Sequence, residues 1–107
     1  MSIRVKFKTW ANYPEAVSNN AKRGIELNEK VGNKCAEQTG KVRGQQLAQR
    51  QPVSFDTVQR MYNFLNRHAK NYDESDTKAC GTISYLLWGG KAGLRWAEKI
   101  MREEGQL

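Results

Sequence analysis

The sequence predicts an all-α fold, a single compact domain of four to five short helices with a short extended or β-strand N-terminal arm. Three observations support this prediction. Apolar residues recur at helical spacing through most of the chain, and glycine or proline interrupts that pattern between the segments. The 107 residues, 38% of them hydrophobic, suffice for one modest core but not for two. We therefore divide the chain into a basic extended arm, residues 1–12, and a helical domain, residues 13–107.

The N-terminal arm alternates apolar and basic residues. This period of two is typical of a strand or an extended segment, and it places three cations on one face: Arg4, Lys6 and Lys8. The sequence shows no obvious partner strand, so we expect the arm to cover the helical core or to reach out to a ligand. Trp10, which follows these cations, is the tryptophan expected to contact that ligand.

Two helices are expected in the first half of the helical domain. The first begins at Pro14, because proline suits the first helical position, and ends at Gly32. The second is expected over residues 36–50. Its small residues recur at every fourth position, which favours close helix packing over phosphate binding: Ala36, Gly40, Gly44 and Ala48. We expect Trp88 and Trp96 to be buried near the Gly40–Gly44 groove.

The second half is expected to hold a third helix, an acidic loop and two further helices. Ser54 is a good N-cap for the third helix. The loop covers residues 71–79, and the last two helices are expected over residues 81–88 and 91–104. The apolar run LLWGG, which precedes the last helix, also fits a buried strand, but the helical segments on either side of it favour a helix. The third helix has a buried stripe at helical spacing: Val58, Met61, Tyr62, Leu65 and Ala69.

The charge balance favours polyanionic partners. Eighteen Lys and Arg against eleven Asp and Glu give a net charge of +7. Such a surface attracts nucleic acid, anionic lipid or an acidic protein face, although net charge also serves solubility. No apolar run approaches the roughly 20 residues of a membrane span, and the N-terminus lacks the pattern of a signal peptide. We therefore expect no membrane partner, and an intracellular or virion setting.

The segment Ala48–Met61 has the residue spacing of a helix-turn-helix motif. The small residue Ala48 is followed four positions later by a turn at Pro52. Apolar residues then stand one, six and nine positions beyond the turn: Val53, Val58 and Met61. Proline permits a turn there but not the positive φ that the usual glycine adopts. The alternative is an ordinary helix hairpin with a serine N-cap. In such a motif the short polar residues Ser54 and Thr57 would touch phosphates or bases. Five further residues would be exposed and would read the bases: Phe55, Asp56, Gln59, Arg60 and Asn63.

A basic face is predicted on the third helix and just beyond it. Arg60, Asn63, Arg67 and Lys70 share one side at helical spacing. The residues predicted to bind nucleic acid are therefore those of the arm, the motif and this face: Arg4, Lys6, Lys8, Ser54, Thr57, Gln59, Arg60, Asn63, Arg67 and Lys70.

We expect no catalytic residue, metal or cofactor. Two scattered cysteines and one histidine do not make a zinc site. His68 has no nucleophile at motif spacing, and an interaction with the helix dipole or the core is the preferred interpretation. The acidic residues 73–76 lack the glycine and terminal glutamate of a calcium loop. Cys35 and Cys80 are predicted to be reduced and half-buried; a disulfide is the disfavoured alternative, although each cysteine precedes a predicted helix.

Four motifs resemble, in this order, a small domain common in tailed-phage and prophage proteins: NAKRG at Asn20–Gly24, VRGQQLA at Val42–Ala48, TVQRM…RH at Thr57–His68 and WGGKAGLRWA at Trp88–Ala97. That domain occurs alone or attached to head-maturation and other phage structural proteins. The likeness covers about residues 13–101. The loop after His68 departs from it, since many relatives carry a longer passage rich in Gly and Pro. The resemblance implies a phage origin and a mostly helical module, and it supplies no catalytic residue. With a phage origin, the expected location is the host cytoplasm during infection, or the virion.

The leading functional hypothesis is a non-enzymatic phage accessory protein that binds nucleic acid through phosphate contacts of the basic face. Two alternatives stay open. The same face would dock on an acidic capsid or portal surface in a virion or head-assembly component, or the protein would inhibit a host protein. The predicted partner is accordingly nucleic acid, phage capsid or portal, or a host protein.

Overall fold

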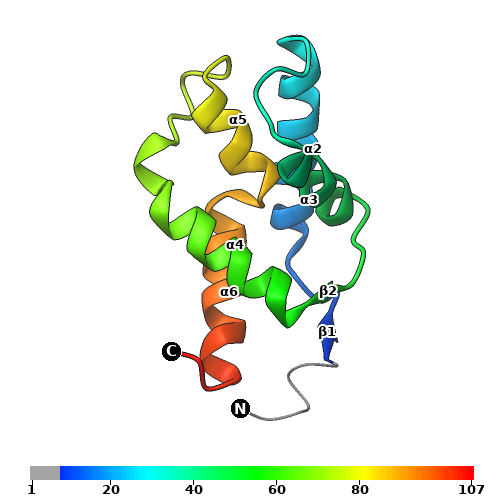
Figure 1. Ribbon diagram of the computed structural model, residues 1–107, viewed down its shortest axis with the longest axis vertical. Coiled ribbons are helices and arrows are strands. Elements are labelled where there is room, and N and C mark those ends of the chain that lie inside the picture. Colours follow the sequence, from blue (N-terminus) through cyan, green and yellow to red (C-terminus); the bar gives the residue numbers. More distant parts are fainter. Residues whose placement is uncertain (1–7) are drawn as a thin grey trace.

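A computed structural model describes residues 8–107 and shows an all-α domain, as predicted. The predictions for Arg4 and Lys6 lie outside these residues. Figure 1 shows the elements along the chain: β1 (Thr9–Trp10), α2 (Glu15–Lys30), α3 (Gln38–Ala48), β2 (Val53–Ser54), α4 (Phe55–Arg67), the 3₁₀ turn η1 (Ala69–Asn71), α5 (Cys80–Leu87) and α6 (Gly90–Glu103). The helix expected over residues 81–88 is therefore confirmed.

The helices form two packed groups. α2 packs on α3 and α5, whereas α4 packs on α6, and contacts of α2 with α6 join the groups. Figure 1 shows α4 crossing in front of α6, with α2 and α3 beside them and α5 above. The molecule measures 42 × 25 × 22 Å.

The N-terminal arm has a partner strand that the sequence did not reveal. Thr9 pairs with Ser54 and Trp10 with Val53 in an antiparallel two-stranded sheet. Trp10 is buried against the ring of Phe55, with the ring centroids 5.9 Å apart. The expectation that Trp10 contacts a ligand is therefore wrong, because its ring is buried in the core of this protein.

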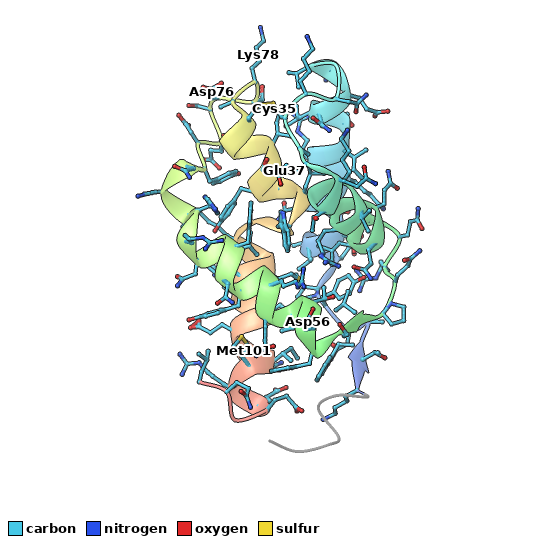
Figure 2. The ribbon with its side chains drawn as sticks, viewed as in Figure 1. Cys35, Glu37, Asp56, Asp76, Lys78 and Met101 are labelled. Atoms are coloured by element: carbon cyan, nitrogen blue, oxygen red, sulfur yellow. A yellow bond between two sulfur atoms is a disulfide. The ribbon has the colours of Figure 1, made fainter. Side chains whose placement is uncertain are left out.

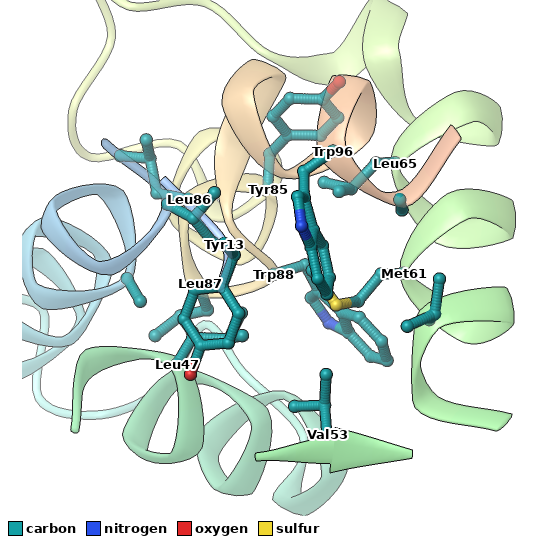
Figure 3. Packing of buried hydrophobic residues seen from close by; sticks show 14 of the residues in the cluster. Tyr13, Leu47, Val53, Met61, Leu65, Tyr85, Leu86, Leu87, Trp88 and Trp96 are labelled. Carbon is teal, nitrogen blue, oxygen red and sulfur yellow. The ribbon is translucent and has the colours of Figure 1, made fainter. Parts of the chain in front are cut away.

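The two other tryptophans are buried, as predicted, but only one lies at the groove of small residues. Trp88 comes close to Gly40: a Cβ added there would lie 3.6 Å from the indole Nε1. Trp96 packs instead against the edge of Tyr13, at 5.3 Å between ring centroids. Figure 3 shows Trp96 facing α4, and Leu87 of α5 fills the place against Gly44 that Trp96 was expected to take.

A tight turn joins α5 to α6. Gly89 and Gly90 adopt φ values of 110° and 65°, which favour glycine strongly over other residues. Asn20 of α2 fixes this bend, since its side-chain Nδ2 donates a 2.9 Å hydrogen bond to the carbonyl oxygen of Gly89. The bend places α6 behind α4 in Figure 1.

Candidate nucleic-acid interface

Residues in the first turn of α4 pack inside the protein and do not face a partner. α3 packs on α2 and α5 and not chiefly on α4, so the two helices do not form the compact unit of a helix-turn-helix motif. Phe55 is buried, and Thr57 is buried with its Oγ1 accepting a hydrogen bond from Arg43 Nη1 at 3.4 Å. The predictions that Phe55 is an exposed reader and that Thr57 touches phosphate or base are therefore wrong.

Ser54 acts as the helix cap that the sequence predicts. Its Oγ accepts a hydrogen bond from the backbone N–H of Thr57 at 3.2 Å, and α4 starts at Phe55. This role occupies the hydroxyl that the motif assigned to a phosphate contact. Gln59, the other polar residue predicted near the start of α4, is half-buried.

The later turns of α4 present the predicted basic face. Arg60, Asn63, Arg67 and Lys70 are all exposed, while Val58, Met61 and Leu65 are buried on the opposite side and Tyr62 is half-buried. Arg60 Nε donates to Asp56 Oδ2 at 2.9 Å, but both side chains remain mostly in solvent. Within residues 8–107, Arg67 and Lys70 form no ion pair. The face is thus available to a partner.

The cation of the arm that the structure describes lies elsewhere. Lys8 Nζ pairs with Glu104 Oε2 at 3.0 Å, at the C-terminal end of α6. Its ammonium also lies 5.7 Å from the centroid of the Trp10 ring. Lys8 is therefore engaged within the molecule and is separate from the face of α4.

Arg60, Asn63 and Arg67 form one wall of a cleft of about 790 Å³. The opposite wall consists of the segments that start α3 and α5, including Glu37 and Gly81. Figure 2 shows Cys35 and Glu37 across this space from α4. The sequence predicted the α4 wall but not the cleft, because the other wall comes from two distant segments.

Aromatic rings line the bottom of this cleft. Phe64 stacks on Trp88 with ring centroids 4.6 Å apart and an angle of 15° between the planes. His68 lies on Phe64, again at 4.6 Å, and its Nδ1 is 3.1 Å from Asn71 Nδ2. Phe64 and His68 are half-buried, so each offers part of its surface to the cleft.

Arg43 adds a buried positive charge that the sequence analysis did not single out. It is 8% exposed, and its guanidinium lies 5.3 Å from the centroid of the Trp88 ring. Nη1 donates to Gln46 and Thr57, while Nε has no hydrogen-bond partner within residues 8–107. Burial lowers the pKa of Arg43, the charge of Arg60 lowers it further, and the carboxylate of Asp56 acts in the opposite direction. Positive charge therefore accumulates behind the cleft as well as on its α4 wall.

A disulfide joins Cys35 and Cys80, so the prediction of reduced cysteines is wrong. The two Cα atoms are 4.6 Å apart although the residues are separated by 45 positions. Cys35 is held in place by a hydrogen bond from Ser84 Oγ to its carbonyl oxygen and by one from its N–H to Asn28 Oδ1. The bond ties the segment before α3 to the first residue of α5, which makes one wall of the cleft rigid.

No group of three or more His, Cys, Asp or Glu within residues 8–107 is arranged to hold a metal ion. In the same part of the chain, no helix is both long and apolar enough to span a bilayer. Comparisons with protein-family models, with curated proteins and with solved structures found no match. A functional proposal therefore rests on the residues of this chain and on its motifs.

Proposed function

We propose that the protein is a non-enzymatic bacteriophage accessory protein that binds nucleic acid through the exposed face of α4. The observation that carries the proposal is the row of Arg60, Asn63 and Arg67 along that face, at the edge of a cleft with aromatic rings. The phage origin in this proposal rests on the motif resemblance alone.

The spacing of the two arginines suits a phosphate backbone. Residues seven apart are two turns apart, about 10 Å along the helix axis. Each guanidinium presents a planar set of donors that matches a phosphate oxygen pair. Asn63 lies between Arg60 and Arg67 and carries the amide that fits a base edge or a further phosphate oxygen. Lys70, exposed in η1, adds a further cation shortly after the end of α4.

A salt titration of binding tests this proposal. Arg60→Ala together with Arg67→Ala should weaken binding and lower the slope of log K against log [salt] by about two, roughly one for each phosphate that an arginine no longer neutralises. Arg95→Ala together with Lys99→Ala is the matched control, since it removes two cations from α6. An equal loss of affinity in both double variants would show that only net charge matters and would refute the α4 interface.

One observation favours a second candidate, a virion or head-assembly component. Disulfides are rare in cytosolic proteins and persist in oxidising settings such as virion surfaces. The bond between Cys35 and Cys80 therefore supports a role in the particle more than one in the host cytoplasm. Under this second proposal the protein should co-sediment with mature particles at high salt and retain its disulfide there. Recovery only in the particle-free lysate would count against it.

A further inference from the structure

The cleft beside α4 has the size and lining of a small-ligand site. Its volume of about 790 Å³ falls within the range of roughly 300–1,000 Å³ that is usual for such sites. Arg60 and Arg67 lie on one wall, and the half-buried ring of Phe64, which stacks on the buried Trp88, offers aromatic surface. Cations and aromatic rings in one cavity suit a ligand that has both a phosphate and a flat ring.

The opposite wall adds backbone dipoles of the same sign. α3 and α5 both begin at the cleft, and their N-caps, Glu37 and Ala79, make no side-chain hydrogen bond to the first turn. The first N–H groups of each helix therefore lack a side-chain cap, and the helix dipoles place partial positive charge there. The Cys35–Cys80 disulfide holds the two helix starts together.

Arg43 adds a buried cation beside the cleft. Its side chain is 8% exposed and forms no ion pair within residues 8–107, although Nη1 donates to Gln46 and Thr57. Its guanidinium lies 5.3 Å from the ring centroid of Trp88, a residue that lines the cleft. A buried cation is stabilised by negative charge nearby. A phosphate on Arg60 would add to the effect that the carboxylate of Asp56 already has on Arg43.

Glu37 indicates how the ligand is oriented. It is an exposed acidic residue on the wall opposite Arg60 and Arg67. A phosphate is repelled by this carboxylate and attracted by the two guanidinium groups, so it belongs on the α4 side. The half-buried rings of Phe64 and His68 lie on the same side of the cleft, so the base of that nucleotide can lie against them, where stacking tolerates any sequence.

We propose that this cleft binds one unpaired nucleotide of a single strand, with its phosphate on Arg60 and Arg67 and its base against Phe64 and His68. This inference rests on the proposed nucleic-acid binding and specifies its form. In a duplex the bases are stacked and paired, so one of them would have to be extruded before it could enter. Single strands should therefore bind more tightly than duplexes.

Fluorescence anisotropy with four DNA probes tests the inference. The probes are a labelled single-stranded oligo-dT, an abasic strand of equal length and charge, a duplex of the same length, and unlabelled dTMP as competitor. Oligo-dT should bind about tenfold more tightly than the abasic strand, because only the base is missing there. Competition by dTMP at micromolar concentration would overturn the strand assignment and identify a free nucleotide as the ligand of the same site.

Two cleft variants and one control decide the position of the base. Phe64→Leu keeps an apolar side chain but removes the stacking ring, and it should reduce oligo-dT binding to the level of the abasic strand. His68→Ala, at a half-exposed position, serves the same purpose if Phe64→Leu does not fold. Tyr62→Leu removes another half-buried ring of α4 that does not line the cleft, and it should leave binding unchanged.

The outcomes separate this inference from the proposed function. Equal binding of oligo-dT, abasic strand and duplex, with the salt slope still dependent on Arg60 and Arg67, would overturn the cleft inference and leave the α4 interface standing. Absence of binding to every probe would overturn both.

Discussion

The two walls of the cleft differ in how they carry charge. The α4 wall uses the long exposed side chains of Arg60 and Arg67. The opposite wall combines the carboxylate of Glu37 with the partial positive charge at the starts of α3 and α5, which the disulfide between Cys35 and Cys80 fixes to each other. Exposed side chains adjust to a ligand and are screened by salt, whereas backbone groups hold one geometry. We therefore expect the α4 wall to set the salt dependence of binding and the disulfide wall to set its shape selectivity.

The largest expected effect comes from removing the disulfide. Replacing Cys35 and Cys80 by serine should lower the free energy of unfolding by about 4 kcal/mol, because the bond joins residues 45 positions apart. Thermal denaturation with and without reductant should then show a drop of more than about 10 °C. The salt slope of binding should stay the same, since no charge is removed. A melting temperature unchanged within about 2 °C would contradict the structural role of this wall.

A pair of glycines tests how tightly the helices behind the disulfide wall are packed. A Cβ on Gly24 would lie 2.8 Å from the backbone nitrogen of Leu87, so Gly24→Ala should cost about 1–3 kcal/mol through overpacking. Gly40→Ala is the matched control, because its Cβ would meet Trp88 at an ordinary 3.6 Å. There the better helix propensity of alanine should stabilise the protein by up to about 1 kcal/mol. Urea denaturation distinguishes the two, and equal effects would refute the difference in packing.

Ser54→Ala separates the structural start of α4 from its binding face. Loss of the cap should lower the free energy of unfolding by about 1 kcal/mol. The salt slope should not change, because the hydroxyl of Ser54 is used by the helix. A slope lowered by about one would instead restore Ser54 as a phosphate-binding residue.

The smallest expected effect concerns the acid that faces Arg60. Asp56→Asn removes the exposed ion pair and frees Arg60 for a phosphate. Such pairs on a helix are worth about 0.3–0.5 kcal/mol, so binding should tighten about twofold. Stability should fall slightly, because Asp56 also lies in the first turn of α4, where a negative charge is favourable. Weaker binding would show that Asp56 itself contributes to recognition.

Local patterns predicted much of the fold and of the α4 wall. The helical period placed Val58, Met61 and Leu65 inside and Arg60 and Arg67 outside, because both faces belong to one continuous segment. The same reasoning found the cap at Ser54 and the glycine breaks. The helix-turn-helix spacing misassigned Phe55 and Thr57, because an apolar and polar pattern alone does not fix how two helices pack.

What the sequence analysis missed depends on pairing between distant segments. The partner of Trp10 in the sheet, the bond between Cys35 and Cys80, and the position of Arg43 over Trp88 each join parts of the chain that have no shared period. Cys80 begins α5 and Cys35 lies three residues before α3, but position along the chain alone does not show that these two helix starts lie together. Arg43 gave no signal, since a single arginine among polar residues of a helix is typical of an exposed face.

The turn at Gly89 and Gly90 has a consequence for recognising distant relatives. Both residues need a positive φ, and a Cβ on Gly90 would lie 2.5 Å from the side-chain nitrogen of Asn20. A chain with this fold must therefore keep the glycine pair, whereas exposed residues such as Arg60 and Arg67 can diverge without loss of the fold. The pair of glycines then serves as a marker of ancestry and the two arginines as a marker of binding. A relative that retains the first without the second would share the architecture but not the interface.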